Sequence, residues 1–219
     1  YKALEDIARD RTLTPEERKE MKLYSRLADA FTPLAKGMNS EYANQNAYDA
    51  ISVHGGSGFI MEYKCQRLFR DARIFSIYEG TTQLQVVAAI RYVTNGTYLG
   101  IIKEMLEKEV APEFQALKER VAKMVEKYED AINYVKAAGN NDLHNFLARR
   151  LYEMTAEIIM SLLILDDATR APELFAKSAN VYVRYAEGTV AGHYAYIKEF
   201  KAEDLADFLA AAPEEAPAE

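Results

Sequence analysis

Cysteine and histidine are scarce in this sequence, and long apolar runs are missing. Cys65 is the single cysteine, so no disulfide can form within the chain, and we expect a reducing, cytoplasmic location. The three histidines are scattered, which makes a structural zinc site improbable, and we predict no metal. No apolar run approaches the roughly 20 residues that a membrane-spanning helix needs. The packing of this chain must therefore come from ordinary hydrophobic side chains.

Glycine and proline are also infrequent, with 10 and 6 residues in 219, which argues against an all-β fold with many turns. Hydrophobic residues make up 49% of the chain and charged residues 28%, a balance typical of a globular protein. The net charge of -7 disfavours nucleic acid as a partner, because nucleic acid binds to basic surfaces. The composition therefore indicates a globular protein that is not all-β, and the helical patterns along the chain make the predicted fold all-α.

Apolar residues recur at intervals of three and four along the second half of the chain. Stripes of this kind bury one face of a helix against its neighbours, and short connections make the neighbours antiparallel. We therefore predict a helical bundle over residues 97–211 and a disordered tail over 212–219. The two clearest stripes are Phe114, Leu117, Val121, Met124, Tyr128, Ile132 and Val135, and then Leu143, Leu147, Leu151, Met154, Ile158, Leu162 and Leu165.

The first half of the chain contains clear signals for the start and end of a long helix. Thr14 followed by proline, with Glu17 three residues on, predicts a helix start with a capping box. This helix should run to about Val53, with Pro33 kinking or splitting it. The sequence HGGSGF should end it, since glycine is a poor helix former. Shorter helices are predicted over residues 61–70, 80–94, 98–110 and 203–211.

One acidic residue, Glu79, stands between an apolar run and a predicted helix start. A carboxylate there can simply interact with the helix dipole, worth roughly 0.3–1 kcal/mol. It can instead be a base in an apolar pocket, where loss of water makes a carboxylate more reactive. Phe75, Ile77 and Tyr78 would help to build such a pocket. Spacing alone favours the first interpretation.

The segment Val53–Gln85, VHGGSGFIMEYKCQRLFRDARIFSIYEGTTQLQ, resembles the C-terminal signature of acyl-CoA dehydrogenases. The matching elements are the G-G-x-G-F turn, the E-Y dipeptide, R-D-A-R-I, and I-Y-E-G-T followed by Q. By this resemblance, residues 1–96 are the closing helices of that family's catalytic bundle. Residues 97–211 resemble an extra C-terminal helical domain of a longer bacterial subgroup, which includes the methylthiopropionyl-CoA dehydrogenases.

The resemblance implies α,β-desaturation of an acyl-CoA thioester, a reaction of fatty acid metabolism. Glu79 would be the catalytic base that removes the α-proton, while the β-hydrogen leaves as hydride to N5 of FAD. An electron-transfer flavoprotein would be the electron acceptor. Tyr78, Glu79 and Gly80 would contact the substrate, and the backbone N–H of Glu79 would polarise the thioester carbonyl.

The remaining implied contacts are with the cofactor. Thr81 and Gln83 match positions that contact FAD, and Gly55 and Gly56 match a turn that approaches the FAD of a neighbouring subunit. A homodimer or homotetramer is therefore expected. The family usually has Gln at position 52 and Pro at position 64, where this chain has Ser52 and Lys64.

The family's N-terminal helical and β domains have no counterpart in these 219 residues. We therefore expect the chain to be the C-terminal fragment of a longer enzyme, inactive alone. Two alternatives stay open. One is a flavoenzyme of the acyl-CoA oxidase kind, and the other is a non-catalytic helical assembly module that keeps the signature as a relic. The intact Glu79-Gly80-Thr81 sequence argues against the relic.

Overall fold

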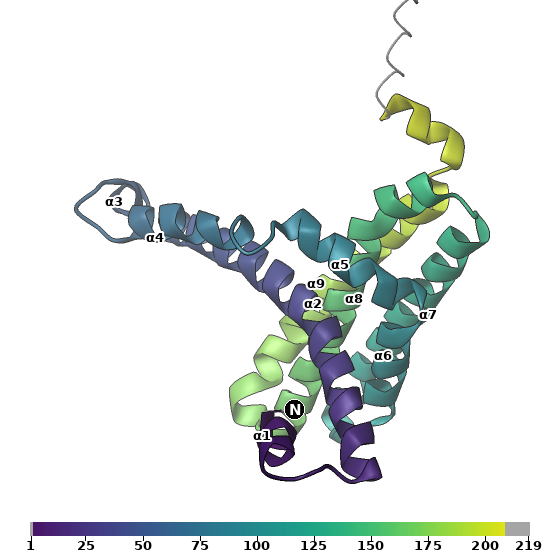
Figure 1. Ribbon diagram of the computed structural model, residues 1–219. Helices are drawn as coiled ribbons and strands as arrows, with labels where there is room; N and C mark the ends of the chain where they lie inside the picture. Colours follow the sequence, from purple (N-terminus) through teal and green to yellow (C-terminus); the bar gives the residue numbers. More distant parts are fainter. Residues whose placement is uncertain (1, 209–219) are drawn as a thin grey trace, which may run out of the picture.

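The computed structural model describes residues 2–208, and every regular element within them is a helix (Figure 1). The predicted all-α fold is confirmed. None of these helices is both long and apolar enough to cross a membrane. The predicted tail, 212–219, lies outside the described residues. The α-helices are α1 (Lys2–Asp10), α2 (Pro15–His54), α3 (Gly56–Phe59), α4 (Cys65–Ala72), α5 (Thr82–Thr94), α6 (Thr97–Glu107), α7 (Gln115–Ala137), α8 (Asn141–Arg170) and α9 (Pro172–Glu199), and the 3-10 helices are η1 (Arg73–Ser76), η2 (Pro112–Phe114) and η3 (Ala202–Asp207).

Helix α2 is one unbroken element of 40 residues. It begins with the predicted capping box, in which the Thr14 hydroxyl accepts from the Glu17 N–H at 3.2 Å and the Glu17 carboxylate accepts from the Thr14 N–H at 2.9 Å. The expectation that Pro33 splits the helix is wrong. Pro33 is buried, and the Tyr152 hydroxyl of α8 lies 3.0 Å from its carbonyl, so packing and a bond from α8 hold the helix across the missing backbone N–H.

Four predicted helices have bounds that differ from the structure. The helix predicted over 61–70 begins at Cys65 and ends at Ala72. The helix predicted from residue 80 begins at Thr82, because Gly80 has a φ of +92°, which is not helical. Of the last segment, predicted over 203–211, the described part holds a 3-10 helix over Ala202–Asp207, and residues 209–211 lie outside the described residues. The helix expected over 98–110 spans Thr97–Glu107.

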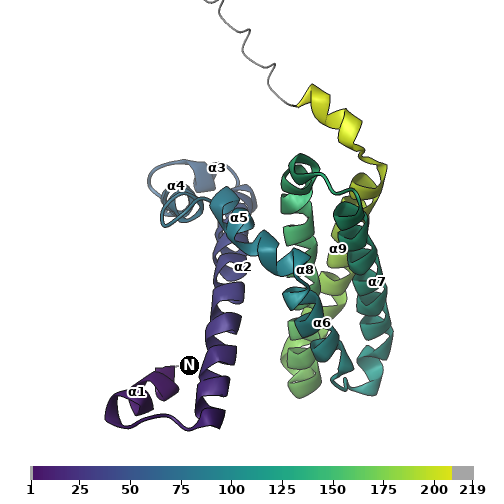
Figure 2. The same cartoon turned by 45° about the vertical axis from the view of Figure 1, so that its right-hand side comes forward.

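Two groups of helices are joined through α5 and α6 (Figure 2). One group is α2 with α3, α4 and η1, whose far end projects away from the rest of the molecule (Figure 1). The other is the bundle of α7, α8 and α9, in which α8 packs on both other helices. Helix α5 packs against α2 on one side and α8 on the other, so it connects the two groups.

The apolar stripe of α8 forms the centre of the bundle, as its spacing predicts. Its side chains are almost completely removed from solvent, and they meet equally buried residues of α7 and α9. Burial of this kind is the main stabilising contribution to a helical bundle. The buried α8 residues include Leu143, Leu147, Leu151, Met154, Ile158 and Leu165.

A buried carboxyl group links α2 to the bundle. Glu157 of α8 is only 3% exposed, and its two carboxyl oxygens accept hydrogen bonds from the hydroxyls of Tyr42 and Tyr182, each at 2.7 Å. Burial raises the pKa of both tyrosines, and the bonds to Glu157 raise it further. Tyr42 belongs to α2 and Tyr182 to α9, so one side chain connects three helices.

Replacing this carboxyl should destabilise the chain. Glu157→Ala removes the buried acceptor of two half-buried hydroxyls, which we expect to lower the free energy of unfolding by about 2–3 kcal/mol. Urea denaturation measures the change. Glu126→Ala, at an exposed position of α7, is the matched control and should alter stability by less than about 0.5 kcal/mol. Equal effects of the two substitutions would contradict the structural role of Glu157.

A second carboxyl, Glu153, predicts a pH dependence of stability. Burial disfavours its charged form, but hydrogen bonds from His193 (3.0 Å) and Arg149 (2.8 Å) outweigh burial and lower its pKa below the ordinary 4.5. A carboxyl with a lowered pKa stabilises the fold above its unfolded-state pKa and loses that contribution as the pH falls through its folded-state pKa. Glu153→Gln should therefore destabilise the chain at pH 7 by up to about 1 kcal/mol. The difference in free energy of unfolding between the variant and the unsubstituted chain should become smaller below about pH 4.5. Urea denaturation at several pH values measures this difference, and a difference that stays constant down to about pH 3 would refute the prediction.

Candidate functional site

Glu79 lies in a turn between η1 and α5 with an unusual backbone. Its φ is +53°, and it is the one non-glycine residue between 2 and 208 with a positive φ. Side chains disfavour this left-handed conformation by about 1–2 kcal/mol, and it persists only where surrounding contacts hold it. Gly80 follows with a φ of +92°. The local conformation is therefore imposed by contacts from elsewhere in the chain.

The conformation of the turn favours a glycine at position 80. A Cβ atom at this position would lie 2.8 Å from the side-chain nitrogen of Gln85, and its φ disfavours any side chain. The backbone of the turn therefore lies close to the Gln85 side chain in the first turn of α5. Without a side chain at position 80, the carbonyls of Glu79 and Gly80 are accessible to donors.

Two donors from different helices hold those carbonyls. The Lys36 ammonium of α2 donates to the Gly80 carbonyl at 2.6 Å. The Gln85 side-chain nitrogen of α5 donates to the Gly80 carbonyl at 3.2 Å and to the Glu79 carbonyl at 3.3 Å. The turn is therefore fixed against both α2 and α5.

Further bonds from α2 hold the residues on either side of the turn. The Ser40 hydroxyl donates to the Phe75 carbonyl at 2.9 Å, and the Thr82 hydroxyl donates to the Glu41 carboxylate at 2.5 Å. The sequence analysis missed Lys36, Ser40 and Glu41. A signal was present, because polar residues at positions 36, 40 and 44 are four residues apart and so lie along one face of a helix.

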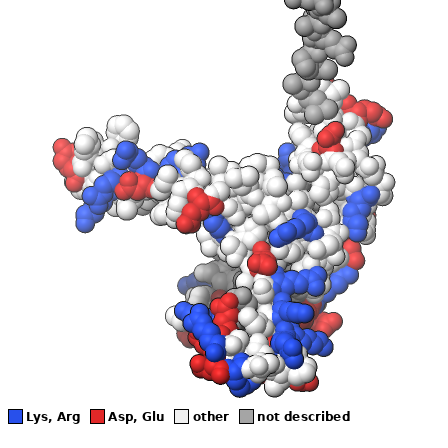
Figure 3. Space-filling model, in the orientation of Figure 1, with Lys and Arg blue, Asp and Glu red and all other residues white. Residues whose placement is uncertain are grey.

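A cavity of about 520 Å³ lies beside this turn. Lys36 and Ser40 of α2 line one side of it, and Phe75, Tyr78 and Glu79 line the other. Phe75 and Tyr78 thus contribute apolar surface beside the carboxylate, whereas Ile77 does not line this cavity and Glu79 itself is exposed. Phe75 is 44% exposed and Tyr78 46%, so the described residues leave the cavity open on one side. Uncharged side chains dominate the middle of the face shown in Figure 3, where α5 crosses.

The predicted cofactor residues occupy two separate places. Thr81 caps α5, accepting from the Leu84 N–H at 3.3 Å, and Gln83 is exposed in the first turn of that helix. Gly55 and Gly56 lie where α2 ends, with open space around both backbones. Fifteen residues separate Ser40 from Gly55, about 20 Å of helix, so the structure does not bring the glycine turn to Glu79.

An apolar groove of about 320 Å³ adjoins the Glu79 cavity. Ala35 and Asn39 of α2 line both, and Ala156 and Ile159 of α8 line only the groove. The C-terminal bundle therefore reaches the helix that carries one wall of the cavity.

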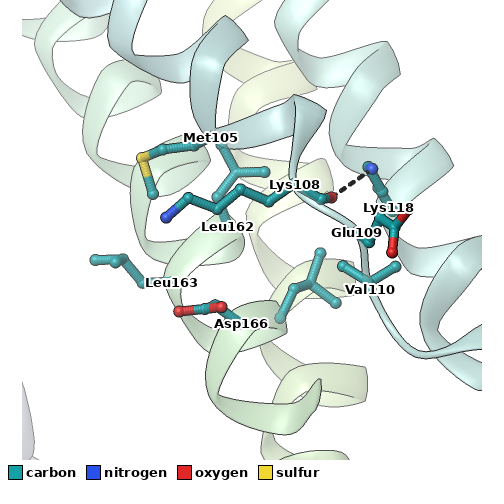
Figure 4. Close-up of a pocket in the computed structure, with 9 residues that line it drawn as sticks. Met105, Lys108, Glu109, Val110, Lys118, Leu162, Leu163 and Asp166 are labelled. Carbon is teal, nitrogen blue, oxygen red and sulfur yellow. Dashed lines mark hydrogen bonds between the residues drawn. The ribbon is translucent and has the colours of Figure 1, made fainter. Parts of the chain in front are cut away.

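A small cavity between α8 and the connection after α6 offers no comparable chemistry (Figure 4). Its volume is about 20 Å³, room for about one water molecule. The Lys118 ammonium donates to the Lys108 carbonyl at 2.7 Å, which ties this connection to α7. Within residues 2–208, no three potential metal ligands lie close enough together to hold a metal ion.

Several curated proteins match part of this chain. Subunit CarC of the caffeyl-CoA reductase-Etf complex from Acetobacterium woodii is 50% identical over 52 residues, which are 24% of this chain and 14% of CarC. A 3-(aryl)acrylate reductase from Clostridium sporogenes is 47% identical over 58 residues, 26% of this chain and 15% of that protein. An acyl-CoA dehydrogenase from Bacillus subtilis is 39% identical over 64 residues, 29% of this chain and 17% of that protein. The matched segments thus span about a sixth of these relatives or less.

A crystal structure of an acyl-CoA dehydrogenase family protein from Porphyromonas gingivalis is 37% identical, with a TM-score of 0.49, covering 52% of this chain and 98% of that one. Two family models match the chain in succession. The model for the acyl-CoA dehydrogenase C-terminal domain matches residues 16–93, and the model described as acyl-CoA dehydrogenase C terminal matches residues 94–205, more than half of the chain. The chain therefore belongs to the acyl-CoA dehydrogenase family and is related to its C-terminal part.

Proposed function

We propose that this chain is the C-terminal part of an FAD-dependent acyl-CoA dehydrogenase that desaturates an acyl-CoA thioester between its α and β carbons, with Glu79 as the catalytic base. The observation that carries the proposal is the position of Glu79, in a left-handed turn held by α2 and α5, beside a cavity of about 520 Å³. We further propose two units, residues 1–96 of the catalytic helical domain and residues 97–211 as an additional helical bundle.

The side chains at the cavity suit removal of an α-proton. A thioester α-proton is only weakly acidic, so the base must be close, correctly aimed and shielded from water. The Glu79 carboxylate would take the proton, and the Tyr78 and Phe75 rings would exclude water on their side. The Glu79 N–H would donate to the thioester oxygen and stabilise the negative charge that develops there. Other segments of the complete protein would close the open side of the cavity.

The exposed polar groups of the chain fit a flavin cofactor. The first turn of α5 offers backbone N–H groups beside Thr81 and Gln83, and such helix starts favour anionic or polar ligand groups. Gly55 and Gly56 offer backbone that a phosphate can approach closely. When bound, FAD supplies the acceptor for the β-hydrogen. Because the glycine turn is remote from Glu79, we propose that it serves the site of a second subunit, in a homodimer or homotetramer.

The names of two relatives bear on the electron acceptor and on the direction of the reaction. CarC is named as a subunit of a reductase-Etf complex, which supports an electron-transfer flavoprotein as the partner of this enzyme. Two matching relatives are named as reductases. The same carboxyl, when protonated, would return the α-proton in the reverse reaction, so both directions should be assayed.

The decisive substitution is Glu79→Gln in the complete protein. Glutamine keeps the size of the side chain but cannot accept the α-proton, so the rate of flavin bleaching by saturated acyl-CoA thioesters should fall by about 10²-fold or more. Anaerobic stopped-flow absorbance measures this rate. The matched control is Glu104→Gln on the exposed surface of α6, which should leave it unchanged.

Bleaching at an undiminished rate in Glu79→Gln would reject Glu79 as the base. Failure of every saturated thioester to bleach the bound flavin of the unsubstituted protein would reject the dehydrogenase. Fast peroxide formation in air, without reduction of an electron-transfer flavoprotein, would indicate an oxidase instead.

A further inference from the structure

Lys36 has an uncommon environment for a lysine. It is half-buried in α2, and none of the ion pairs formed among residues 2–208 includes it. Its ammonium donates instead to the Gly80 carbonyl at 2.6 Å and lies 5.9 Å from the centre of the Tyr78 ring. A side chain that is usually flexible and strongly hydrated thus forms a hydrogen bond with a backbone oxygen 44 residues further along the chain.

The bond is made at a turn whose backbone is in a disfavoured conformation. Glu79 is the non-glycine residue with a left-handed φ, and Gly80 continues the positive φ. A strained turn relaxes unless contacts outweigh the strain. The carbonyl that Lys36 holds belongs to the residue directly after Glu79, in the Gly80–Thr81 peptide, so the bond fixes the C-terminal end of the turn that carries Glu79.

We propose that Lys36 is a positioning residue for Glu79. By holding the Gly80 carbonyl it keeps Glu79 in the left-handed conformation and its carboxylate at the cavity that Lys36 itself lines. Gln85 acts on the same carbonyl from α5, so the two donors together locate the turn in two directions. This inference rests on the proposed role of Glu79 as the base.

The test is Lys36→Met in the complete protein, which keeps the length of the side chain and removes its donor. Misplacing a reacting group by about 1 Å can cost about 10²-fold in rate, so we expect the first-order rate of flavin bleaching to fall about 10- to 100-fold. The thioester concentration that gives half-maximal rate should stay within about threefold, since Lys36 acts on the base. Lys22→Met, at an exposed position of the same helix, is the matched control and should leave both values unchanged.

A second measurement does not depend on turnover. Backbone amide hydrogen exchange in the peptide Tyr78–Gln85 should become faster in Lys36→Met, because the turn opens more often. Peptides from α8 should exchange as in the unsubstituted protein. A general loss of stability would instead accelerate exchange in both regions, so this readout separates positioning from folding.

The shared carbonyl gives an independent check. Groups that act through one atom are energetically coupled, so in the variant Lys36→Met with Gln85→Leu the combined loss of rate should differ from the product of the single losses by about threefold or more. If the loss of rate in the double variant equals the product of the two single losses, the idea that Lys36 and Gln85 act through the same carbonyl is overturned.

The outcomes also separate this inference from the proposed function. If Glu79→Gln abolishes bleaching while Lys36→Met bleaches within about twofold of the unsubstituted rate, the positioning role is wrong and the base assignment stands. If Lys36→Met merely lowers the melting temperature, with unchanged rate per bound flavin, the residue is structural and the inference is also overturned. If Glu79→Gln keeps full activity, the proposed function fails first, and the role of Lys36 fails with it.

Discussion

The arrangement of the candidate site depends on the continuity of α2. One face of this helix holds the turn at Glu79 through Lys36 and the adjoining segment through Ser40. Other positions on the helix bond to the C-terminal bundle, where the Tyr42 hydroxyl donates to Glu157 and the Tyr152 hydroxyl lies at the Pro33 carbonyl. If α2 broke at Pro33, the segment that carries Lys36 and Tyr42 would lose its alignment with the bundle. The contacts of α8 at Pro33 therefore matter to the site as well as to stability.

The conformation of the turn is explained by comparing the free-energy cost of backbone strain with the contribution of the hydrogen bonds. A left-handed Glu79 costs about 1–2 kcal/mol. A hydrogen bond from a charged donor contributes about 1.5–3 kcal/mol net, and a neutral one about 0.5–1.5 kcal/mol. The bond from the charged Lys36 therefore offsets the strain by itself, whereas the neutral Gln85 alone falls short of it. With Gln85 as the sole donor the turn should be loosely defined.

Local signals in the sequence predicted most of the fold. The capping box at Thr14 and the stripe along α8 depend on residues three or four apart, and these predictions are confirmed. The start of α5 was misplaced because the positive φ of Gly80, which keeps this residue out of the helix, cannot be read from the residue type. The role of Glu157 was not readable, since its partner Tyr42 is 115 residues away, and for Lys36 the spacing of positions 36, 40 and 44 indicated a shared helix face but not the partner 44 residues away. Glu79 was singled out by the resemblance of its motif, and its environment, which the motif does not describe, came from the structure.

Because α2 is rigid, its contact with the turn through Lys36 and its contact with the C-terminal bundle through Tyr42 move together. Side chains lie about 5–6 Å from the axis of a helix, so a rotation of about 10° moves their tips by about 1 Å. A shift of that size away from the turn would lengthen the Lys36 bond from 2.6 Å to a distance at which a hydrogen bond no longer exists. Tyr42, less than two turns further along the same helix, is held by the buried carboxyl of Glu157 and so resists such a rotation. The bundle thus does more than pack beside α2 and α5, since it fixes the rotation of the helix from which Lys36 reaches the turn.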